Sequence, residues 1–347
     1  MNIDEPYIHY SRYAQNIALA GFFLTTFLCS LLVYLTIFEI TRNFGSYKNL
    51  LVTFASFGIF FASTEVVLKL NVYSHNAGWI FYAISRPFDL STSFMNWLLP
   101  LYTGSYSLTT SMLSVQFVYR YCALFHESKL RFFGGWRFLI CIFFALLFAI
   151  QWAMGMHYFL EFDDYSISYF RIEMLEKYNM DISEIAGVAL VVYDADGSIR
   201  WWNVLCTLNM TFIMSVQYTI IIYCAVRMYL NMETKLQLLS STLRIQHKQF
   251  YKTLILQVVT PTFTLFLPIM MVNNLPFLNL HFDFPSGIFT SGLVLYPALD
   301  ACIVMYVVQD YRKAIRNVFK KSVDKIQFTV TWTQNTTTVN VQNAVLF

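Results

Sequence analysis

The chain has 347 residues, of which 57% are hydrophobic and only 12% carry a charged side chain. Soluble globular domains contain roughly 25% charged residues, and a soluble protein of this size could not cover its surface with so few. The composition therefore excludes a soluble enzyme, a disordered chain and a secreted disulfide scaffold. The net charge of +3 is too small to indicate a nucleic-acid partner.

Seven stretches of the sequence are apolar over the length that a helix needs to cross a bilayer, which is about 20 residues. Within them, only Glu65 and Asp300 are ionisable residues far from an end. The sequence therefore predicts an all-α fold, a bundle of seven transmembrane helices. The stretches are residues 14–38, 47–70, 90–119, 138–160, 201–226, 253–277 and 286–309.

Basic residues are divided unevenly between the connectors of these stretches. The odd-numbered connectors and the C-terminal tail hold 17 Lys and Arg, whereas the N-terminus and the even-numbered connectors hold 6. Because basic loops stay in the cytoplasm, we expect the N-terminus outside and the C-terminus inside. The predicted organisation is an extracellular N-terminus (1–13), a seven-transmembrane receptor domain (14–309), an amphipathic cytoplasmic helix (310–326) and a flexible tail (327–347).

In two of the predicted cytoplasmic segments, basic residues recur at the spacing of one helical turn. Residues 310–326 place apolar side chains on one face and basic ones on the other, which is typical of a helix lying on anionic lipid. Arg244 and Lys248, one turn apart, begin a basic stripe that leads into the sixth stretch. The alternative for both segments is positive-inside topology with no further role.

The longest connector, residues 161–200, has a pattern of its own. We expect a helix over residues 165–179, a strand over 187–193, a turn at Asp194–Gly197 and a return strand over 198–202. The Asp-x-Asp-Gly of the turn lacks the other ligands of a calcium loop. No metal site and no cofactor is predicted here or elsewhere in the chain.

A ligand pocket between helices would open toward the outer halves of the stretches. The polar and amphipathic residues found there are the candidate ligand contacts, although polar stripes also serve as contacts between helices. A lining rich in aromatics and without a dedicated charge favours a small, neutral, fairly apolar ligand. The candidates are Asn96, Trp97, Tyr102, Ser105, Trp201, Asn203 and Asn273.

Prolines interrupt the last two stretches. Pro261 and Pro268 divide the sixth stretch into segments that could pivot, because proline removes a backbone hydrogen bond inside a helix. A hinge of this kind would amplify small ligand contacts, and a static kink is the alternative.

An ordered set of motifs resembles the Str class of nematode serpentine chemoreceptors, which are seven-transmembrane G-protein-coupled receptors. The third stretch ends on Tyr119, Arg120 and Tyr121, in the position of the arginine motif of such receptors. The resemblance covers about residues 45–315. Its motifs are GSYKNLL at 45–51, FVYRYCAL at 117–124, QFYKTLILQVVTP at 249–261, LP at 267–268, YPALD at 296–300 and YR at 311–312.

The resemblance implies a chemosensory receptor in the plasma membrane of the sensory cilium, with an odorant and a heterotrimeric G protein as partners. It makes Arg120 the coupling arginine and places Pro297 and Asp300 where related receptors carry a switch. Two features depart from the wider pattern. Tyr119 replaces the acidic neighbour of the arginine, and the disulfide between the third span and the following outer loop has no candidate cysteines.

Two other functional classes, an ion channel and an enzyme, are alternatives to a receptor of this kind. A seven-span, ligand-gated odorant channel is the alternative to a G-protein-coupled receptor, but such channels keep the N-terminus inside, against the distribution of basic residues. An enzyme is not expected, because metal-binding and nucleophile motifs are absent from the sequence. Membrane lipids are further expected partners, and receptor oligomers are left open.

Overall fold

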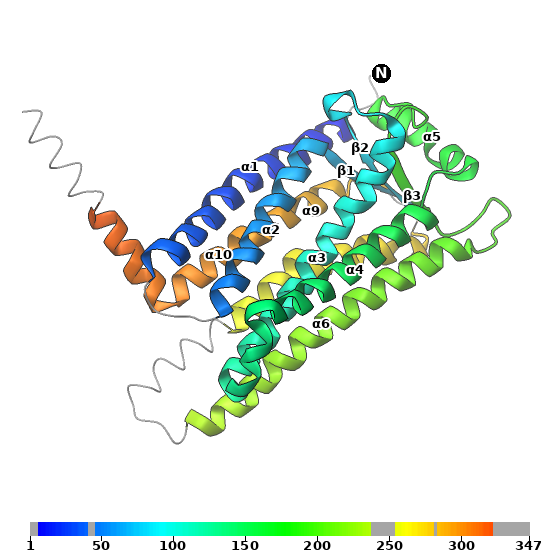
Figure 1. The fold of residues 1–347 in the computed structure, drawn as a ribbon. Helices are drawn as coiled ribbons and strands as arrows, with labels where there is room; N and C mark the ends of the chain where they lie inside the picture. The colour runs from blue at the N-terminus through cyan, green and yellow to red at the C-terminus, as the bar shows by residue number, and fades with distance from the viewer. Residues whose placement is uncertain (1–5, 41–45, 237–253, 281–282, 322–347) are drawn as a thin grey trace, which may run out of the picture.

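The computed structural model describes residues 6–40, 46–236, 254–280 and 283–321, which form a helical bundle with a small sheet across one end (Figure 1). We call this the sheet end, and the other the Arg120 end. α3 is mostly buried, since it packs against α2, α4 and α6. The long helices are α1 (Pro6–Tyr34), α2 (Ser46–Leu68), α3 (Thr92–Phe125), α4 (Phe138–Phe159), α6 (Trp201–Leu236) and α10 (Tyr296–Val307).

Within the described residues, six helical segments are long and apolar enough to cross a membrane, and each matches a predicted stretch. The remaining predicted stretch corresponds to α3, which has 34 residues and is not among the six. It is more polar because its buried face carries hydroxyl groups that bond to α6. The Gln217 side chain lies among them: Thr110 donates to its Oε1 at 2.7 Å, and its Nε2 donates to Ser111 at 2.7 Å. Small hydroxyl residues allow helices to approach closely, so this polarity stabilises the bundle.

The sixth span changes its geometry between two prolines. Residues 254–261 are helical, a π-helical turn follows at Thr262–Phe266, and α8 runs over Leu267–Asn274. Pro261 directly precedes the π-turn and Pro268 lies in the first turn of α8. Because proline has no N–H to donate, the regular hydrogen-bond ladder is lost there. The predicted break in this helix therefore lies between the two prolines.

The seventh span is also composite, with α9 (Gly287–Ser291) and a 3₁₀ turn (Gly292–Leu295) preceding α10. Pro297, in the first turn of α10, packs directly on Gly58 of α2. A Cβ atom at Gly58 would lie 2.5 Å from the Cβ of Pro297. The glycine therefore permits α2 and α10 to touch at this level.

Replacing Gly58 with alanine is expected to lower the free energy of unfolding by about 1–3 kcal/mol, because the rigid Pro297 ring cannot rotate away from the added methyl group. The melting temperature of the detergent-purified protein measures this. Gly292→Ala is the control, since nothing lies within 4 Å of its added Cβ. Equal melting temperatures for the two variants would contradict the close contact.

Three connectors unite at the sheet end in one antiparallel sheet, ordered β3-β2-β1-β4. β1 (Leu70–His75) and β2 (Gly78–Ala83) form a hairpin that pairs His75 with Gly78. β3 (Gly187–Val191) pairs with β2, and the short β4 (Asp283–Phe284) pairs with β1. This sheet is an addition to the all-α prediction, and it ties together loops that are far apart in the sequence.

The connector between α4 and α6 follows the sequence prediction in part. α5 (Asp164–Tyr178) forms as expected, with Asp163 and Ser166 in a capping box and left-handed Asn179 at its end. The predicted turn also forms, with Gly197 at a φ of 81°. The predicted return strand over 198–202 is wrong: β3 pairs with β2 instead, Trp201 already belongs to α6, and a single bridge between Tyr193 and Ile199 remains.

Residues 309–321 form the amphipathic helix predicted after the seventh span, while 322–326 lie outside the described residues. Tyr311 is buried, and its hydroxyl lies 2.7 Å from that of Thr36, in the π-helical turn Leu35–Glu39 that follows α1. Phe319 is 68% exposed. The first turn of this helix is therefore anchored on the bundle, and its distal apolar side chain remains uncovered by the described part of the protein. Arg244, Lys248 and the tail over 327–347 also lie outside the described residues.

Candidate functional site

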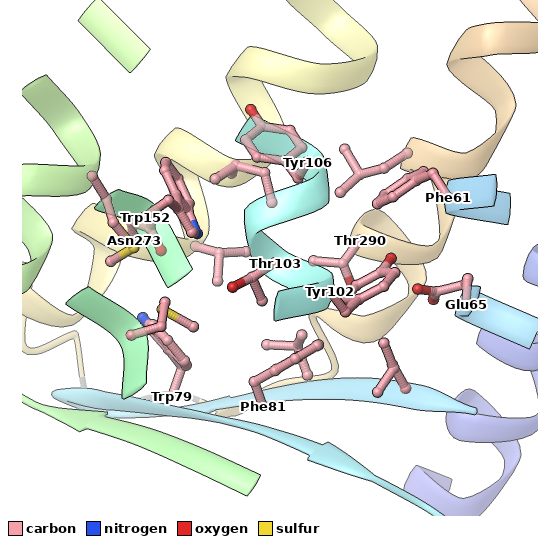
Figure 2. A pocket seen from close by; sticks show the side chains of 17 residues that line it. Phe61, Glu65, Trp79, Phe81, Tyr102, Thr103, Tyr106, Trp152, Asn273 and Thr290 are labelled. Carbon is pink, nitrogen blue, oxygen red and sulfur yellow. The ribbon is translucent and has the colours of Figure 1, made fainter. Parts of the chain in front are cut away.

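A cavity lies directly beneath the sheet, between the helices (Figure 2). Its volume is about 70 Å³, far below the roughly 300–1,000 Å³ of pockets that hold drug-sized ligands. Its walls are mainly apolar and aromatic, so it suits a small, largely apolar molecule. The lining comes from several helices and from the hairpin, and includes Phe61, Val72, Trp79, Tyr106, Trp152 and Met210.

The hairpin closes this pocket because side chains alternate between the two faces of a strand. Val72 of β1, with Trp79 and Phe81 of β2, faces the pocket. Their neighbours on the opposite face, Tyr73 and Ile80, pack in a separate cluster beneath α5. The sheet is therefore both the cover of the pocket and the floor on which α5 lies.

Few polar groups reach into the pocket. On one side, the Tyr102 hydroxyl points toward the buried carboxylate of Glu65 and bonds with it (Figure 2). The Tyr102 ring stacks on Phe61 at 5.1 Å and on Phe81 at 6.1 Å between centroids. Glu65 is thus held by α3 beside an aromatic wall at one side of the pocket.

On the other side of the pocket, three buried N–H donors have no acceptor within the described part of the chain. They are the indole Nε1 of Trp79, the indole Nε1 of Trp152 and the amide Nδ2 of Asn273. All three side chains are at most 5% exposed. A buried donor without a partner costs about 1–3 kcal/mol, so the described side chains leave this part of the pocket incomplete.

Two of the seven predicted ligand contacts, Tyr102 and Asn273, line this pocket. Asn203 lines a second, polar cavity nearby, and its amide donates to Val191 at 2.8 Å. The other four line neither cavity. Trp97 and Trp201 are 47% and 65% exposed on the outside of the bundle, Asn96 accepts from the backbone of Gly187, and Ser105 donates within α3.

The sheet is joined to the start of the seventh span by a cluster that we call the sheet-end clasp: His75, Glu173, Lys177 and Asp283. His75 Nδ1 lies 2.5 Å from Asp283, and Lys177 pairs with Asp283 and, at 2.5 Å, with Glu173. The His, Glu and Asp atoms lie within 4.8 Å of one another, close enough to share a metal ion. The Lys177 ammonium already lies against both carboxylates, so the cluster is an ion-pair network rather than an open cation site.

The clasp is expected to weaken in acid. Burial disfavours the charged form of Asp283, but hydrogen bonds with Lys177 and His75 outweigh it and hold the pKa of Asp283 below its ordinary 3.8. A depressed pKa stabilises the fold above that ordinary value and ceases to do so as pH falls through the folded-state pKa. At pH 7 the melting temperature of Asp283→Asn should therefore be lower than that of wild type. Below pH 3.8 this difference should shrink and disappear. A difference that persists unchanged in stronger acid would contradict this.

At the Arg120 end, a buried arginine is bonded to three helices. Arg120 of α3 donates to Gln257 of the sixth span at 2.8 Å and to the Tyr47 hydroxyl of α2 at 3.3 Å. It also donates to Gln116, one turn back in its own helix, at 3.2 Å. The Gln257 side chain bonds in addition with Asp300 of α10, whose carboxylate attracts Arg120 electrostatically. We call these side chains the arginine network.

The other residues predicted for this end have structural contacts. Tyr119 stacks on Tyr47, with 5.2 Å between ring centroids, and meets Phe133 edge-on. Tyr121 points its hydroxyl at His126, 3.4 Å away. Tyr119 thus packs beside the arginine network, in the place where an acidic residue would form an ion pair.

The sequence did not indicate several pocket residues. Trp79 and Phe81 belong to the hairpin, and the sequence indicates only a connector between two spans at this place. Trp152 lies in an uncharged span where nothing distinguishes it from lipid-facing neighbours. Glu65 is an ionisable residue inside a predicted span, and such residues tend to mark functional sites, but the sequence does not place it at a pocket.

The fold and these sites define a multi-pass membrane protein of the seven-helix receptor class, with a covered pocket at one end and a buried arginine at the other. Residues 14–316 match the family model of serpentine seven-transmembrane chemoreceptors named Str. The chain belongs to this family, a family of receptors rather than enzymes.

Related proteins from nematodes agree with this assignment. The chain is 34% identical over 304 residues to "G-protein coupled receptor str-33" of Caenorhabditis elegans, covering 86% of this chain and 88% of the relative. It is 26% identical over 296 residues to "Serpentine receptor class r-10" of the same organism, covering 83% of this chain and 86% of the relative.

Proposed function

We propose that this chain is a chemosensory receptor that binds a small, neutral odorant in the pocket under the sheet and activates a heterotrimeric G protein at the Arg120 end. The family assignment supports the receptor class. The apolar lining and small volume of the pocket support a volatile-sized ligand. The arginine network supports a coupling site, because it joins the helices that would have to separate for a partner to enter.

The proposal includes an orientation, with the sheet end outside the cell and the Arg120 end inside. The distribution of basic residues supports it, with 17 on the side of the C-terminus and 6 on the other. An epitope tag at the N-terminus should be reachable on intact cells, and a tag at the C-terminus only after permeabilisation. The reverse result would favour the odorant-channel class instead.

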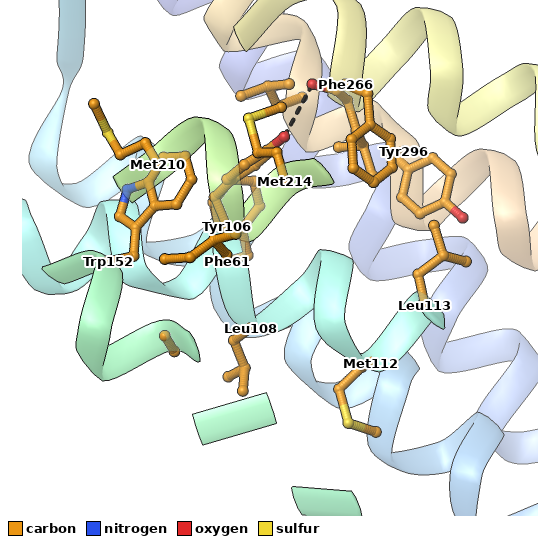
Figure 3. Close-up of a cluster of buried hydrophobic side chains, with 14 of the residues drawn as sticks. Phe61, Tyr106, Leu108, Met112, Leu113, Trp152, Met210, Met214, Phe266 and Tyr296 are labelled. Carbon is orange, nitrogen blue, oxygen red and sulfur yellow. Dashed lines mark hydrogen bonds between the residues drawn. The ribbon is translucent and has the colours of Figure 1, made fainter. Parts of the chain in front are cut away.

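One contact carries the argument that the two ends communicate. Tyr106 lines the pocket, and its hydroxyl donates to the backbone carbonyl of Leu265 at 3.1 Å (Figure 3). Leu265 belongs to the π-turn that interrupts the sixth span. The same turn is held to α6 by the Tyr218 hydroxyl, 3.0 Å from Thr262. The wall of the pocket is therefore bonded directly to the irregular turn of the sixth span.

In the proposed mechanism, a ligand shifts the equilibrium toward a state in which the sixth span is displaced outward at the Arg120 end. Displacement about the turn between Pro261 and Pro268 would withdraw Gln257 from Arg120 and open a surface for the G protein. The ligand must bind that state more tightly than the resting state, because equal affinity shifts nothing.

The proposal is tested in a G-protein reporter cell line with an odorant panel. We expect Arg120→Ala to abolish the ligand-evoked signal at equal surface expression. Arg171→Ala, which removes an exposed arginine from α5, is the control and should signal normally. Full signalling by Arg120→Ala would refute the coupling role of the arginine.

Tyr106→Phe is expected to reduce the maximal response more than the apparent affinity, since it keeps the ring in the pocket and removes the bond to Leu265. One neutral hydrogen bond contributes about 0.5–1.5 kcal/mol, so we expect a roughly 2- to 10-fold loss of coupling efficiency. Dose–response curves of the variant against wild type measure this. A shift in apparent affinity alone would mean that the hydroxyl serves ligand binding and not transmission.

The cellular setting follows from the same proposal. A receptor for volatile compounds is expected in the plasma membrane of a sensory cilium, where the ligand arrives. Helix 309–321 would lie on the anionic inner leaflet, with Lys313, Arg316 and Lys320 toward the lipid headgroups. Imaging of a tagged receptor in sensory neurons tests this location.

A further inference from the structure

We propose that the ligand of the pocket is an uncharged hydrogen-bond acceptor, a small molecule whose carbonyl or ether oxygen accepts from two of the N–H groups of Trp79, Trp152 and Asn273. The inference rests on the proposed function, since it takes the pocket beneath the sheet as the ligand site. It adds the chemistry by which that site selects.

The donors supply the first step. Figure 2 shows Trp79, Trp152 and Asn273 on one side of the pocket, away from Glu65. An indole nitrogen can only donate, so the two tryptophans cannot satisfy each other. One ether or carbonyl oxygen has two lone pairs and can accept from two of these donors at once.

The opposite side of the pocket gives the second step, which is the absence of charge on the ligand. Glu65 is the carboxylate that lines the pocket, and the Tyr102 hydroxyl is directed at it. A cationic ligand would have to compete with Tyr102 for Glu65 while presenting positive charge to the N–H donors. An anionic ligand would meet Glu65 itself inside a desolvated site. A neutral acceptor fits both sides.

The volume gives the third step. A cavity of about 70 Å³ is smaller than the roughly 150 Å³ engineered cavity that holds benzene. On that scale the resting pocket holds about three heavy atoms without moving its walls, so a ring of five atoms is at the upper limit of what it can admit. With so few atoms in the ligand, a single polar group decides selectivity, because apolar walls contribute nearly the same binding free energy to any ligand of a given size.

Three five-membered rings that differ in one ring atom test the inference. Tetrahydrofuran carries an acceptor oxygen, cyclopentane carries a methylene group there, and pyrrolidine is cationic at neutral pH. Each is added to the detergent-purified full chain up to the aqueous solubility of cyclopentane. Apparent affinity is taken from the concentration dependence of the melting temperature. The buried thiols of Cys29 and Cys206 report unfolding through a thiol-reactive dye.

We expect tetrahydrofuran to bind about tenfold more tightly than cyclopentane, and pyrrolidine to bind most weakly. The double variant Trp152→Phe/Asn273→Leu keeps the apolar shape of the site and should remove the advantage of tetrahydrofuran. Trp79→Phe should reduce it separately, which guards against misfolding of the double variant. Trp136→Phe, at a 73% exposed tryptophan between α3 and α4, should preserve it.

Each contrary result overturns the acceptor inference. Equal binding of tetrahydrofuran and cyclopentane would mean that the donors are satisfied by water, and stronger binding of pyrrolidine would make Glu65 the selecting group. Absence of binding by all three rings also refutes it. Thr290→Trp, which fills the pocket from α9, separates this from the proposed function. If it blocks odorant-evoked signalling while the donor variants do not alter selectivity, the pocket remains the ligand site and only the acceptor chemistry is wrong.

Discussion

Asp300→Leu is expected to destabilise the receptor severely, with a loss of about 3 kcal/mol in the free energy of unfolding and little protein at the cell surface. Asp300 is 2% exposed, and its carboxylate is the negative charge that compensates Arg120 in the arginine network. Gln257 lies between the two charged groups, so they interact electrostatically without a direct bond. Removing Asp300 leaves the buried guanidinium of Arg120 without this compensating charge, which costs more than the interaction itself contributes. Melting temperature and surface labelling measure the effect.

A double variant separates folding from signalling. Arg120→Met/Asp300→Leu removes both charges, so stability should recover to near the wild-type value although coupling is lost. Glu176→Leu, which removes an exposed carboxylate from α5, is the control and should change stability little. If the double variant is as unstable as Asp300→Leu, the aspartate stabilises the bundle through some contact other than Arg120.

The spans were predictable from the sequence because the bilayer demands long apolar helices whatever the packing. The hairpin over Leu70–Ala83 was not predicted. Its strands are fully or nearly fully buried, since one face covers the pocket and the other packs beneath α5, so the usual alternation of polar and apolar residues is absent. The remaining signal was the short turn, where Asn76 has a φ of 45°.

The candidate pocket was predictable only in part for a related reason. Tyr102 and Asn273 were identified because they are polar side chains in outer halves of uncharged spans. Trp97 and Trp201 satisfied the same criterion but are exposed on the bundle surface, as expected for tryptophans of an interfacial belt. Sequence alone does not distinguish an aromatic side chain that faces lipid from one, such as Trp152, that faces a cavity.

At the Arg120 end, the resemblance indicated the arginine but not its partner in the sixth span. Tyr119 stands where the wider receptor pattern has an acidic neighbour, so the sequence does not predict an ion pair within the motif. Gln257 is an ordinary amide within a conspicuous motif, and its role is visible only in the structure, where it lies between Arg120 and Asp300. We propose that this neutral amide, rather than an ion pair within the motif, restrains Arg120 in the resting state.

Gln257→Leu is expected to raise ligand-independent signalling about 10-fold or more. The Arg120–Gln257 bond, at 2.8 Å, joins α3 to the sixth span at the end where the helices are proposed to separate. A hydrogen bond to a charged group contributes about 1.5–3 kcal/mol, and 1.4 kcal/mol is a factor of 10 in an equilibrium. Loss of the bond favours the separated state, since Arg120 can then reach water or a partner. Basal reporter output, normalised to surface expression, measures the change.

The matched control is Gln116→Leu, which removes an equivalent amide 3.2 Å from the same guanidinium. Because Gln116 and Arg120 belong to one helix, their bond does not join α3 to the sixth span, and the rise in basal signalling should be much smaller. A similar rise in both variants would show that the arginine is restrained by its total number of acceptors. A rise in Gln257→Leu alone would show that the resting state is maintained by the interhelical bonds of Gln257 to Arg120 and Asp300.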